Sequence, residues 1–380
     1  MKKVLIVTNR MVGGGAERVL QTLINHIDCK YFEITVCSMH REFIDPRLWK
    51  KDFRYIVLFD NFSETNRCRA AFQRLTKKIK GKLFSILPAS LFYKLYIHEK
   101  YDVEIAFIEG ESTKLIAGST NRASKKIAWV HVDLIHNPWT SFLYSSVEDE
   151  RRYYDRFNTI VCVSQSVHET FCQKYSFHND NRICIQHNPI DDDLIRICAG
   201  EGPVSINHTL QLISLARLEP SKRLKEMLEI CICLKNDHHP FHLHIVGDGS
   251  QREELREFVA MNFLSDFVTF HGHLTNPYPI LSSCDVLIST SLAEGYSTVV
   301  AEALILGVAV VCRECAGMNE LLDNGVNGVL VASDQEMMRY LSSFIQHPHL
   351  VQKYKSLSLD RGKSFCLKKR IESIERLIYD

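Results

Sequence analysis

The chain has 380 residues, of which 46% are apolar and 24% are charged, and its formal net charge is +1. This length and composition are typical of a soluble globular protein with two domains, or three. Because no run of about 18 apolar residues occurs, the sequence predicts no membrane-spanning helix. Residues 1–200 carry 29 Lys and Arg against 23 Asp and Glu, and residues 201–380 carry 17 against 22, so the two halves have different surfaces.

A strand, a glycine loop and a helix open the chain. Residues 4–8 form an apolar run, and because Arg10 follows so soon, this run is too short for the apolar region of a signal peptide. Glycines 13–15 come next, and after them Leu and Ile recur at helical spacing. This order indicates a Rossmann-like domain, although Arg18 stands where the dinucleotide fingerprint has its third glycine. The glycines would let the backbone approach a ligand, and Glu17 and Arg18 could contact an acceptor or a phosphate; a tight turn without a ligand is the alternative.

A basic and aromatic segment follows two further predicted strands, at residues 34–38 and 56–58. From Asn66 to His98 there is no acidic residue, and basic side chains are interleaved with aromatic and aliphatic ones. This pattern suits the surface of an anionic membrane, and a solvated helix face is the alternative. Nucleic acid is not expected as a partner, because no recognition motif accompanies the segment. Its basic residues are Arg67, Arg69, Arg74, Lys77, Lys78, Lys80, Lys82 and Lys94.

Three more strands are predicted at residues 103–107, 126–130 and 159–164. His131 and Asp133 stand just past the end of the second of these, where open α/β sheets bind their ligands. His131 is therefore a candidate site residue, and a histidine whose proton is satisfied locally is the alternative.

Residues 196–208 show little periodicity and contain two glycines and a proline, which indicates a domain boundary. A strand restarts at residues 210–215, and the loop after it carries Arg217 and Lys222. Two cations at a strand end can stabilise the negative charge that grows on a departing nucleoside diphosphate. An ordinary basic loop is the alternative.

Two apolar runs, at residues 286–289 and 308–311, predict parallel strands joined by a helix. Gly295 supplies a turn, and Ser297 or Thr298 can cap the helix. The free N–H groups at the start of this helix would then form a binding site for an anion.

Glu302 is the only residue among Asp, Glu, Lys, Arg and His between Glu294 and Arg313. A carboxylate on an otherwise apolar helix is costly to bury unless a group donates hydrogen bonds to it, and a ribose diol could be that group. A helix with one solvent-facing edge, which carries Glu302, is the alternative.

These motifs resemble those of a known family. The segment from Glu294 to Glu302 resembles the Glu-x7-Glu motif of the retaining glycosyltransferases of family 4, whose GT-B architecture has two facing Rossmann-like domains. The loop with Arg217 and Lys222 resembles the family's diphosphate-binding motif, and Gly-Gly-Ala-Glu-Arg before Val19 resembles members that build bacterial surface polysaccharides.

The resemblance implies a role for each candidate. Glu302 would hold the donor ribose, Glu294 would lie by the donor sugar, and His131 would face the donor sugar and the acceptor. The implied catalytic residues are Glu294, His131, Arg217 and Lys222; the donor-binding residues are Gly15, Arg217, Lys222, Glu294, Gly295, Tyr296, Ser297, Thr298 and Glu302; and the acceptor-binding residues are Glu17, Arg18 and His131.

Metal ions and disulfides are not expected. The 13 cysteines fall mostly within apolar patterns, which predicts reduced core thiols in a cytosolic protein. The pair Cys312 and Cys315 forms a lone C-x-x-C, a weak zinc signal. An Asp-x-Asp begins at Asp191, but Arg217 and Lys222 can supply the charge of a divalent ion, so activity without metal is expected.

The predicted fold is therefore α/β of the GT-B type, with parallel sheets. Residues 1–197 would form an acceptor-binding domain, residues 206–365 a nucleotide-sugar-binding domain, and residues 366–380 a helix that crosses back to the N-terminal domain. The resemblance implies a retaining enzyme that moves a hexose or N-acetylhexosamine from a UDP-sugar to a glycan on a polyprenyl diphosphate, in capsule, O-antigen or exopolysaccharide synthesis. The alternatives are a GDP-sugar donor, a nucleotide-sugar epimerase of the same fold, or a non-catalytic partner subunit. The expected place is the cytoplasm, on the inner face of the cell membrane.

Overall fold

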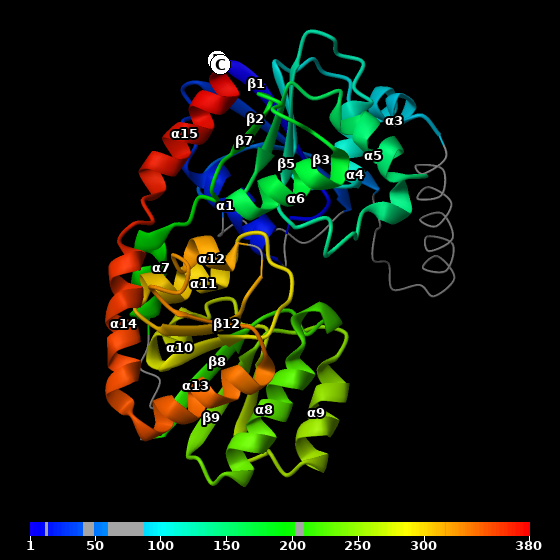
Figure 1. Ribbon diagram of the computed structural model, residues 1–380. Coiled ribbons are helices and arrows are strands. Elements are labelled where there is room, and N and C mark those ends of the chain that lie inside the picture. Colours follow the sequence, from blue (N-terminus) through cyan, green and yellow to red (C-terminus); the bar gives the residue numbers. More distant parts are fainter. Residues whose placement is uncertain (12–13, 41–48, 60–86, 202–208, 316) are drawn as a thin grey trace, which may run out of the picture. The chain divides into compact units, whose positions relative to one another are not determined.

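The computed structural model describes residues 1–11, 14–40, 49–59, 87–201, 209–315 and 317–380. The chain divides into two compact units, Met1–Pro189 with Lys368–Asp380, and Ile190–Leu367 (Figure 1). The division lies earlier than the composition suggested, because helix α7 (Asp192–Ala199) packs on α10 and α11 of the second unit. Residues 196–201 therefore belong to a packed unit and not to a linker.

The first unit contains a seven-stranded sheet in the order β3-β2-β1-β4-β5-β6-β7, and every neighbouring pair is parallel. Its strands are β1 (Lys2–Thr8), β2 (Phe32–His40), β3 (Arg54–Phe59), β4 (Val103–Ala106), β5 (Lys125–Val130), β6 (Thr159–Cys162) and β7 (Ile183–Ile185). Its helices are α1 (Gly15–His26), α3 (Ala89–Tyr96), α4 (Glu111–Ala117), α5 (Val147–Tyr154), α6 (Gln165–Tyr175) and α15 (Leu367–Tyr379), with a 3-10 turn η2 (Ser141–Leu143). All six strands predicted in this half are present, and the three-residue edge strand β7 was not predicted.

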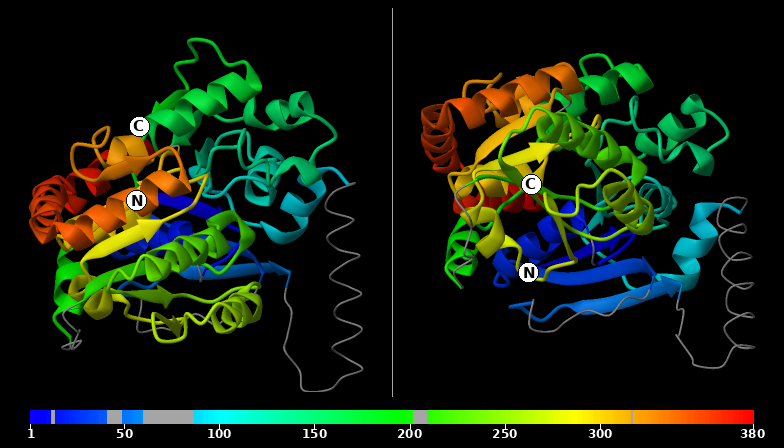
Figure 2. Two further views of the ribbon diagram at one scale, coloured as in Figure 1. Left: turned by 60° about the horizontal axis from the view of Figure 1, so that its bottom comes forward. Right: turned by 90° about the horizontal axis from the view of Figure 1, so that it is seen from below.

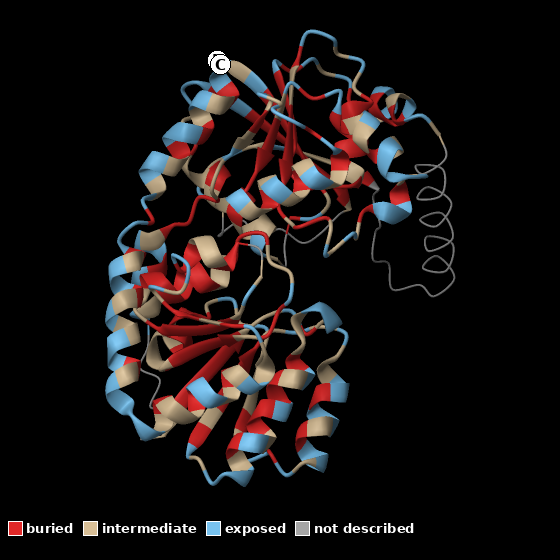
Figure 3. Cartoon of the chain, in the orientation of Figure 1, coloured by how far each residue is buried: buried red, intermediate tan, exposed pale blue. Residues whose placement is uncertain are grey.

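Continuous apolar runs form the central strands because both faces of the sheet are covered. The four central residues of β1, from Val4 to Val7, are wholly buried, and Figure 3 shows that the central strands of both sheets are mostly buried. The C-terminal helix α15 returns to this unit, as predicted. Lys125 Nζ donates to the carbonyl of Leu377 at 2.6 Å, which satisfies a free carbonyl at the end of α15.

The second unit contains a six-stranded parallel sheet in the order β10-β9-β8-β11-β12-β13. Helices α8 and α9 pack against each other and cover one face of it (Figures 1 and 2). Its strands are β8 (Leu210–Leu215), β9 (Phe241–Val246), β10 (Val268–Gly272), β11 (Val286–Ser289), β12 (Ala309–Arg313) and β13 (Val329–Val331). Besides α7 its helices are η3 (Pro220–Lys222), α8 (Leu224–Asn236), α9 (Arg252–Met261), α10 (Tyr278–Ser283), α11 (Thr298–Ile305), α12 (Met318–Leu321), α13 (Asp334–Gln346) and α14 (Pro348–Gly362).

Each sheet has one point where the strand order reverses, between β1 and β4 in the first unit and between β8 and β11 in the second. Ligands of open parallel sheets bind beyond the carboxyl ends of the strands at this switch point. The loops after these four strands are therefore where each unit would bind a ligand. Within the described residues, no helix combines the length and the apolar character needed to cross a bilayer.

Candidate functional site

Lys222 and Glu294 meet at the switch point of the second unit. Lys222 lies on the loop after β8, and Glu294 lies on the loop after β11. Lys222 Nζ is 2.5 Å from Glu294 Oε1, and the two side chains are 21% and 20% exposed. The structure thus brings together two residues 72 positions apart, each of which the sequence had marked as a candidate.

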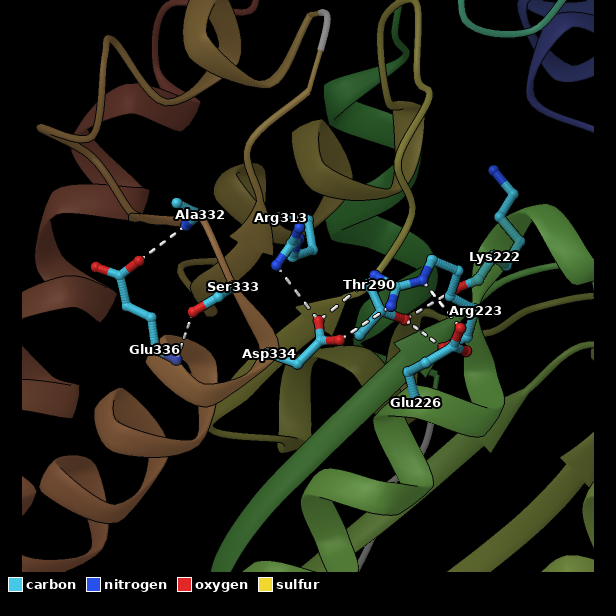
Figure 4. Close-up of polar contacts among 9 residues, drawn as sticks. All are labelled: Lys222, Arg223, Glu226, Thr290, Arg313, Ala332, Ser333, Asp334 and Glu336. Carbon is cyan, nitrogen blue, oxygen red and sulfur yellow. Dashed lines mark hydrogen bonds and ion pairs between the residues drawn. The ribbon is translucent and has the colours of Figure 1, made fainter.

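The backbone of the Lys222 loop is held from two sides (Figure 4). The hydroxyl of Thr290 is buried and shares its hydrogen bond between two backbone carbonyl oxygens, that of Lys222 at 2.8 Å and that of Arg223 at 2.9 Å. Arg223 has a φ of 52°, in the left-handed region, which is unfavourable for a residue with a side chain. Its guanidinium is bound by Asp334 at 2.9 Å and by Glu226 at 3.0 Å. These ion pairs hold Arg223 in its strained conformation and so fix the loop.

Arg217 begins the same loop, and its side chain is exposed. The loop rests on the turn after β9, where Leu218 N donates to the carbonyl of Asp248 at 3.0 Å. A Cβ at Gly247 would lie 1.9 Å from the carbonyl oxygen of Ala216, and Gly247 has a φ of 139°. Only glycine allows this approach. Among the described residues Arg217 forms no ion pair, so the structure does not join it to Lys222 and Glu294.

The turn after Glu294 is packed tightly. Gly317 has a φ of 78°, and a Cβ there would lie 2.1 Å from the carbonyl oxygen of Gly295. Gly295 and Tyr296 are buried. Ser297 caps α11, as predicted, by accepting a hydrogen bond from Val300 N at 3.4 Å. Helix α11 therefore starts at the switch point with its first N–H groups beside this turn.

Glu302 lies in α11 and is only 1% exposed, so the alternative of a solvent-facing edge was wrong. The hydroxyl of Tyr278, on α10, donates to Glu302 Oε1 over 3.5 Å. A carboxylate so enclosed is stable only with hydrogen-bond donors around it.

In the first unit, Glu109 and His131 lie at the ends of β4 and β5. Both are buried, at 1% and 8% exposed. The backbone N–H groups of His131 and Val132 both donate to Glu109 Oε1, the second at 2.9 Å. Burial raises the pKa of Glu109 to about 7, although these N–H groups oppose the rise. Sequence reasoning missed Glu109, yet a Glu-Gly pair directly after a buried strand is the same signal that marked His131.

The ring of His131 is neutral at pH 7. Burial lowers its pKa to about 4, against a hydrogen bond with the backbone of Phe107 that raises it. Its Nε2 atom is buried and has no hydrogen-bond partner in the described part of the chain. The alternative was a histidine whose hydrogen bonds are satisfied by its surroundings, and this holds for only one of the two ring nitrogens. Asp133 lies two residues further on. Its carboxylate accepts a hydrogen bond from the backbone N–H of Ile135 and is hydrogen-bonded to the ring of His136, so it stabilises this turn.

The glycine loop after β1 leads into α1 as predicted, although residues 12–13 lie outside the described residues. Gly15 is the first residue of α1, and Glu17 and Arg18 lie in its first turn with partly buried side chains. Ser112 Oγ donates to Asn9 Oδ1 at 2.9 Å, which links the first turn of α4 to the loop after β1 across the switch point.

Most of the basic and aromatic segment, residues 60–86, lies outside the described residues. The part that the structure describes includes α3, which buries Phe92 and Tyr93 against the unit. Its outer face carries Leu91 and Leu95, which are 52% and 60% exposed, with Lys94 beside them.

Residues of the Asp-x-Asp and of the lone C-x-x-C have structural roles, one in a helix cap and one in the core. Asp191 caps α7 by accepting from Leu194 N at 3.1 Å. Cys312 is wholly buried, which raises its thiol pKa well above the usual range. Within the described ranges, no group of three or more His, Cys, Asp or Glu side chains is arranged to hold a metal ion. The described cysteines are all free thiols.

Comparisons with known proteins match each unit separately. A family model described as Glycosyltransferase Family 4 matches residues 13–194, and one described as Glycosyl transferases group 1 matches residues 209–347. The chain is 24% identical over 382 residues to the Campylobacter jejuni N-acetylgalactosamine-N,N'-diacetylbacillosaminyl-diphospho-undecaprenol 4-alpha-N-acetylgalactosaminyltransferase, with 96% of each chain covered. It is 24% identical over 346 residues to a second C. jejuni alpha-1,4-N-acetyl-D-galactosaminyltransferase, with 89% of this chain and 86% of the other covered.

Solved structures match the whole chain. Anabaena HepE in complex with UDP and glucose is 17% identical with a TM-score of 0.76, and S. aureus TarM is 12% identical with a TM-score of 0.72; both comparisons cover 100% of each chain. The predicted GT-B fold is therefore confirmed.

Proposed function

Because this chain belongs to family 4 of the glycosyltransferases and has their GT-B fold, we propose that it moves a hexose or N-acetylhexosamine from a UDP-sugar to a glycan on a polyprenyl diphosphate. The observation that carries this proposal is the contact of Lys222 with Glu294 at the switch point of the second unit. One cation for a diphosphate and one carboxylate for a sugar stand together where a parallel sheet binds its ligand.

Lys222 and Arg217 would stabilise the charge that develops on the departing UDP, together with the first N–H groups of α11. These two cations would supply the charge for which other transferases use a divalent ion, so the proposed reaction needs no metal. Glu302 would accept hydrogen bonds from the ribose diol, which supplies the donors that a buried carboxylate requires.

The donor and the stereochemistry rest on the relatives. HepE was solved with UDP and glucose, and the names of both C. jejuni relatives specify transfer of N-acetylgalactosamine in an alpha linkage. Transfer from an alpha-linked UDP-sugar to an alpha-linked product retains configuration. We propose that the leaving phosphate guides the acceptor in from the same face, without a glycosyl-enzyme adduct. The neutral Nε2 of His131 would accept a hydrogen bond from a hydroxyl of the donor sugar or the acceptor.

The acceptor proposal also follows the relatives, since the name of the first one specifies a glycan on diphospho-undecaprenol. Such an acceptor lies in a membrane, and the basic, aromatic segment would bring the enzyme to it. Helix α3 contributes Leu91 and Leu95, which could enter the interface beside Lys94. Each Lys or Arg near an anionic surface contributes about 1 kcal/mol, so the binding would be reversible and released by salt.

Flotation with anionic liposomes tests the membrane proposal. Replacement of Lys77, Lys78, Lys80 and Lys82 by Ser should abolish flotation at low salt. The matched control removes the same charge from exposed lysines elsewhere, Lys225, Lys353, Lys363 and Lys369. Equal flotation of the two variants would show that the segment is only a solvated face.

The activity itself is tested with a panel of radiolabelled UDP- and GDP-sugars and a bacterial membrane lipid extract. The proposal expects label from a UDP-sugar to enter the lipid fraction, and Glu294→Gln should reduce this transfer strongly. Free epimerised sugar nucleotide without acceptor would instead indicate an epimerase.

A further inference from the structure

The ion pair of Lys222 and Glu294 joins two side chains that the proposed function assigns to one bound donor, Lys222 to its diphosphate and Glu294 to its sugar. Their charged atoms are 2.5 Å apart, and about four fifths of each side chain is shielded from water. In the part of the chain that the structure describes, neither side chain forms a second ion pair. Each charge therefore depends on the other, in a place where water screens it only partly.

Other contacts of the two loops hold the backbones that carry these side chains, so the ammonium and the carboxylate stay within reach of each other. Thr290 binds the carbonyl of Lys222 at 2.8 Å, and Gly317 packs against the backbone of Gly295, next to Glu294. The neighbouring cation, Arg223, is already bound by Asp334 and Glu226 and is not available to replace Lys222. A diphosphate that binds Lys222 must therefore share this ammonium with the Glu294 carboxylate.

The sharing differs between substrate and product. An intact UDP-sugar brings hydroxyl groups, which donate hydrogen bonds to Glu294 and compensate for the weakened ion pair. UDP alone brings two phosphates and no such donor, so it leaves the carboxylate beside a like charge without compensation.

We propose that Glu294 makes this site discriminate between the sugar nucleotide and its nucleoside diphosphate product. Glu294 would also speed product release, because its ion pair with Lys222 forms again as the diphosphate leaves. The inference rests on the proposed function, because it needs a diphosphate at Lys222. Loss of the Glu294 charge should then tighten the binding of UDP, whereas loss of a group that only assists binding would weaken it.

The test compares UDP with the UDP-sugar that supports turnover, by isothermal titration calorimetry on the whole chain, with Glu294→Gln and Glu294→Ala. UDP should bind both variants more tightly than wild type, on the order of 5- to 20-fold. The UDP-sugar should bind them equally or more weakly, and stopped-flow dissociation of UDP should slow in proportion. Thermal unfolding checks that each variant is folded.

The chain offers a matched control in the ion pair of Lys355 and Asp285, which is 2.7 Å long with side chains 26% and 28% exposed. Asp285 directly precedes β11, so it lies at the amino ends of the strands, whereas Lys222 and Glu294 lie beyond their carboxyl ends. Asp285→Asn should change the UDP dissociation constant by less than about twofold. Unchanged or weaker UDP binding in both Glu294 variants would overturn the inference alone. If wild type binds neither UDP nor GDP, the proposed donor site falls, and the inference falls with it.

Discussion

Replacement of Glu109 by Gln should make the free energy of unfolding less sensitive to pH. Burial raises the pKa of this carboxyl from 4.5 to about 7, so between these values the folded chain holds a proton that the unfolded chain has lost. The stability that this proton contributes is complete below pH 4.5 and is lost as the pH rises through about 7. At about 1.4 kcal/mol for each pKa unit, the loss amounts to roughly 3 kcal/mol.

Gln cannot ionise, yet its carbonyl oxygen can still accept the backbone N–H groups of His131 and Val132. The variant should therefore gain roughly 2 to 3 kcal/mol relative to wild type between pH 5 and pH 8.5. Urea unfolding at five pH values in this range measures the difference, and Glu33→Gln, at an exposed position in the same unit, is the control. A constant difference between Glu109→Gln and wild type across the range would refute the reasoning.

Three further predictions concern the second unit. Glu302→Gln should mainly raise the donor KM, because bonds to ribose form in both ground and transition states, whereas Glu294→Gln should lower kcat on the order of 30- to 1000-fold with a smaller change in KM. Steady-state kinetics against the donor decides this, and equal effects confined to KM would contradict it. Excess EDTA should leave turnover unchanged, and a loss restored by manganese or magnesium would count against the proposed metal independence. Gly317→Ala should lower the melting temperature far more than Gly272→Ala, since both positions have positive φ but only at Gly317 would a Cβ meet backbone, at 2.1 Å. Similar shifts in thermal scans would show that the turn can move.

The sequence predicted the features that are encoded locally. Apolar runs gave the central strands, and the Ser297 cap of α11 could be recognised because a cap depends on a few neighbouring residues. The edge strand β7 was missed because three residues carry too little periodicity. The domain boundary was placed late because the glycines and the proline at residues 200–203 mark a linker by composition, whereas the tertiary packing of α7 on α10 and α11 assigns this helix to the second unit.

The candidate site divides in the same way. Motif spacing marked Lys222 and Glu294, but their contact depends on the order of strands in the folded sheet, which no local pattern encodes. Arg223 has a positive φ that only its ion pairs with residues such as Asp334, distant in the chain, make tolerable. A place past a strand end marks Glu109 as it marks His131, but the contact of Glu109 with two backbone N–H groups just after β5 depends on the order of strands in the folded sheet.

The central claim is tested most directly by transfer of labelled sugar from a UDP-sugar to a lipid-linked glycan by the purified chain. Incubation with the donor and a bacterial membrane lipid extract, followed by organic extraction and determination of the anomeric configuration, should yield an alpha-linked product in the lipid fraction. The same incubation with Lys222→Ala should yield almost none. No lipid-linked label from any UDP- or GDP-sugar, or a beta-linked product from an alpha-linked donor, would contradict the account.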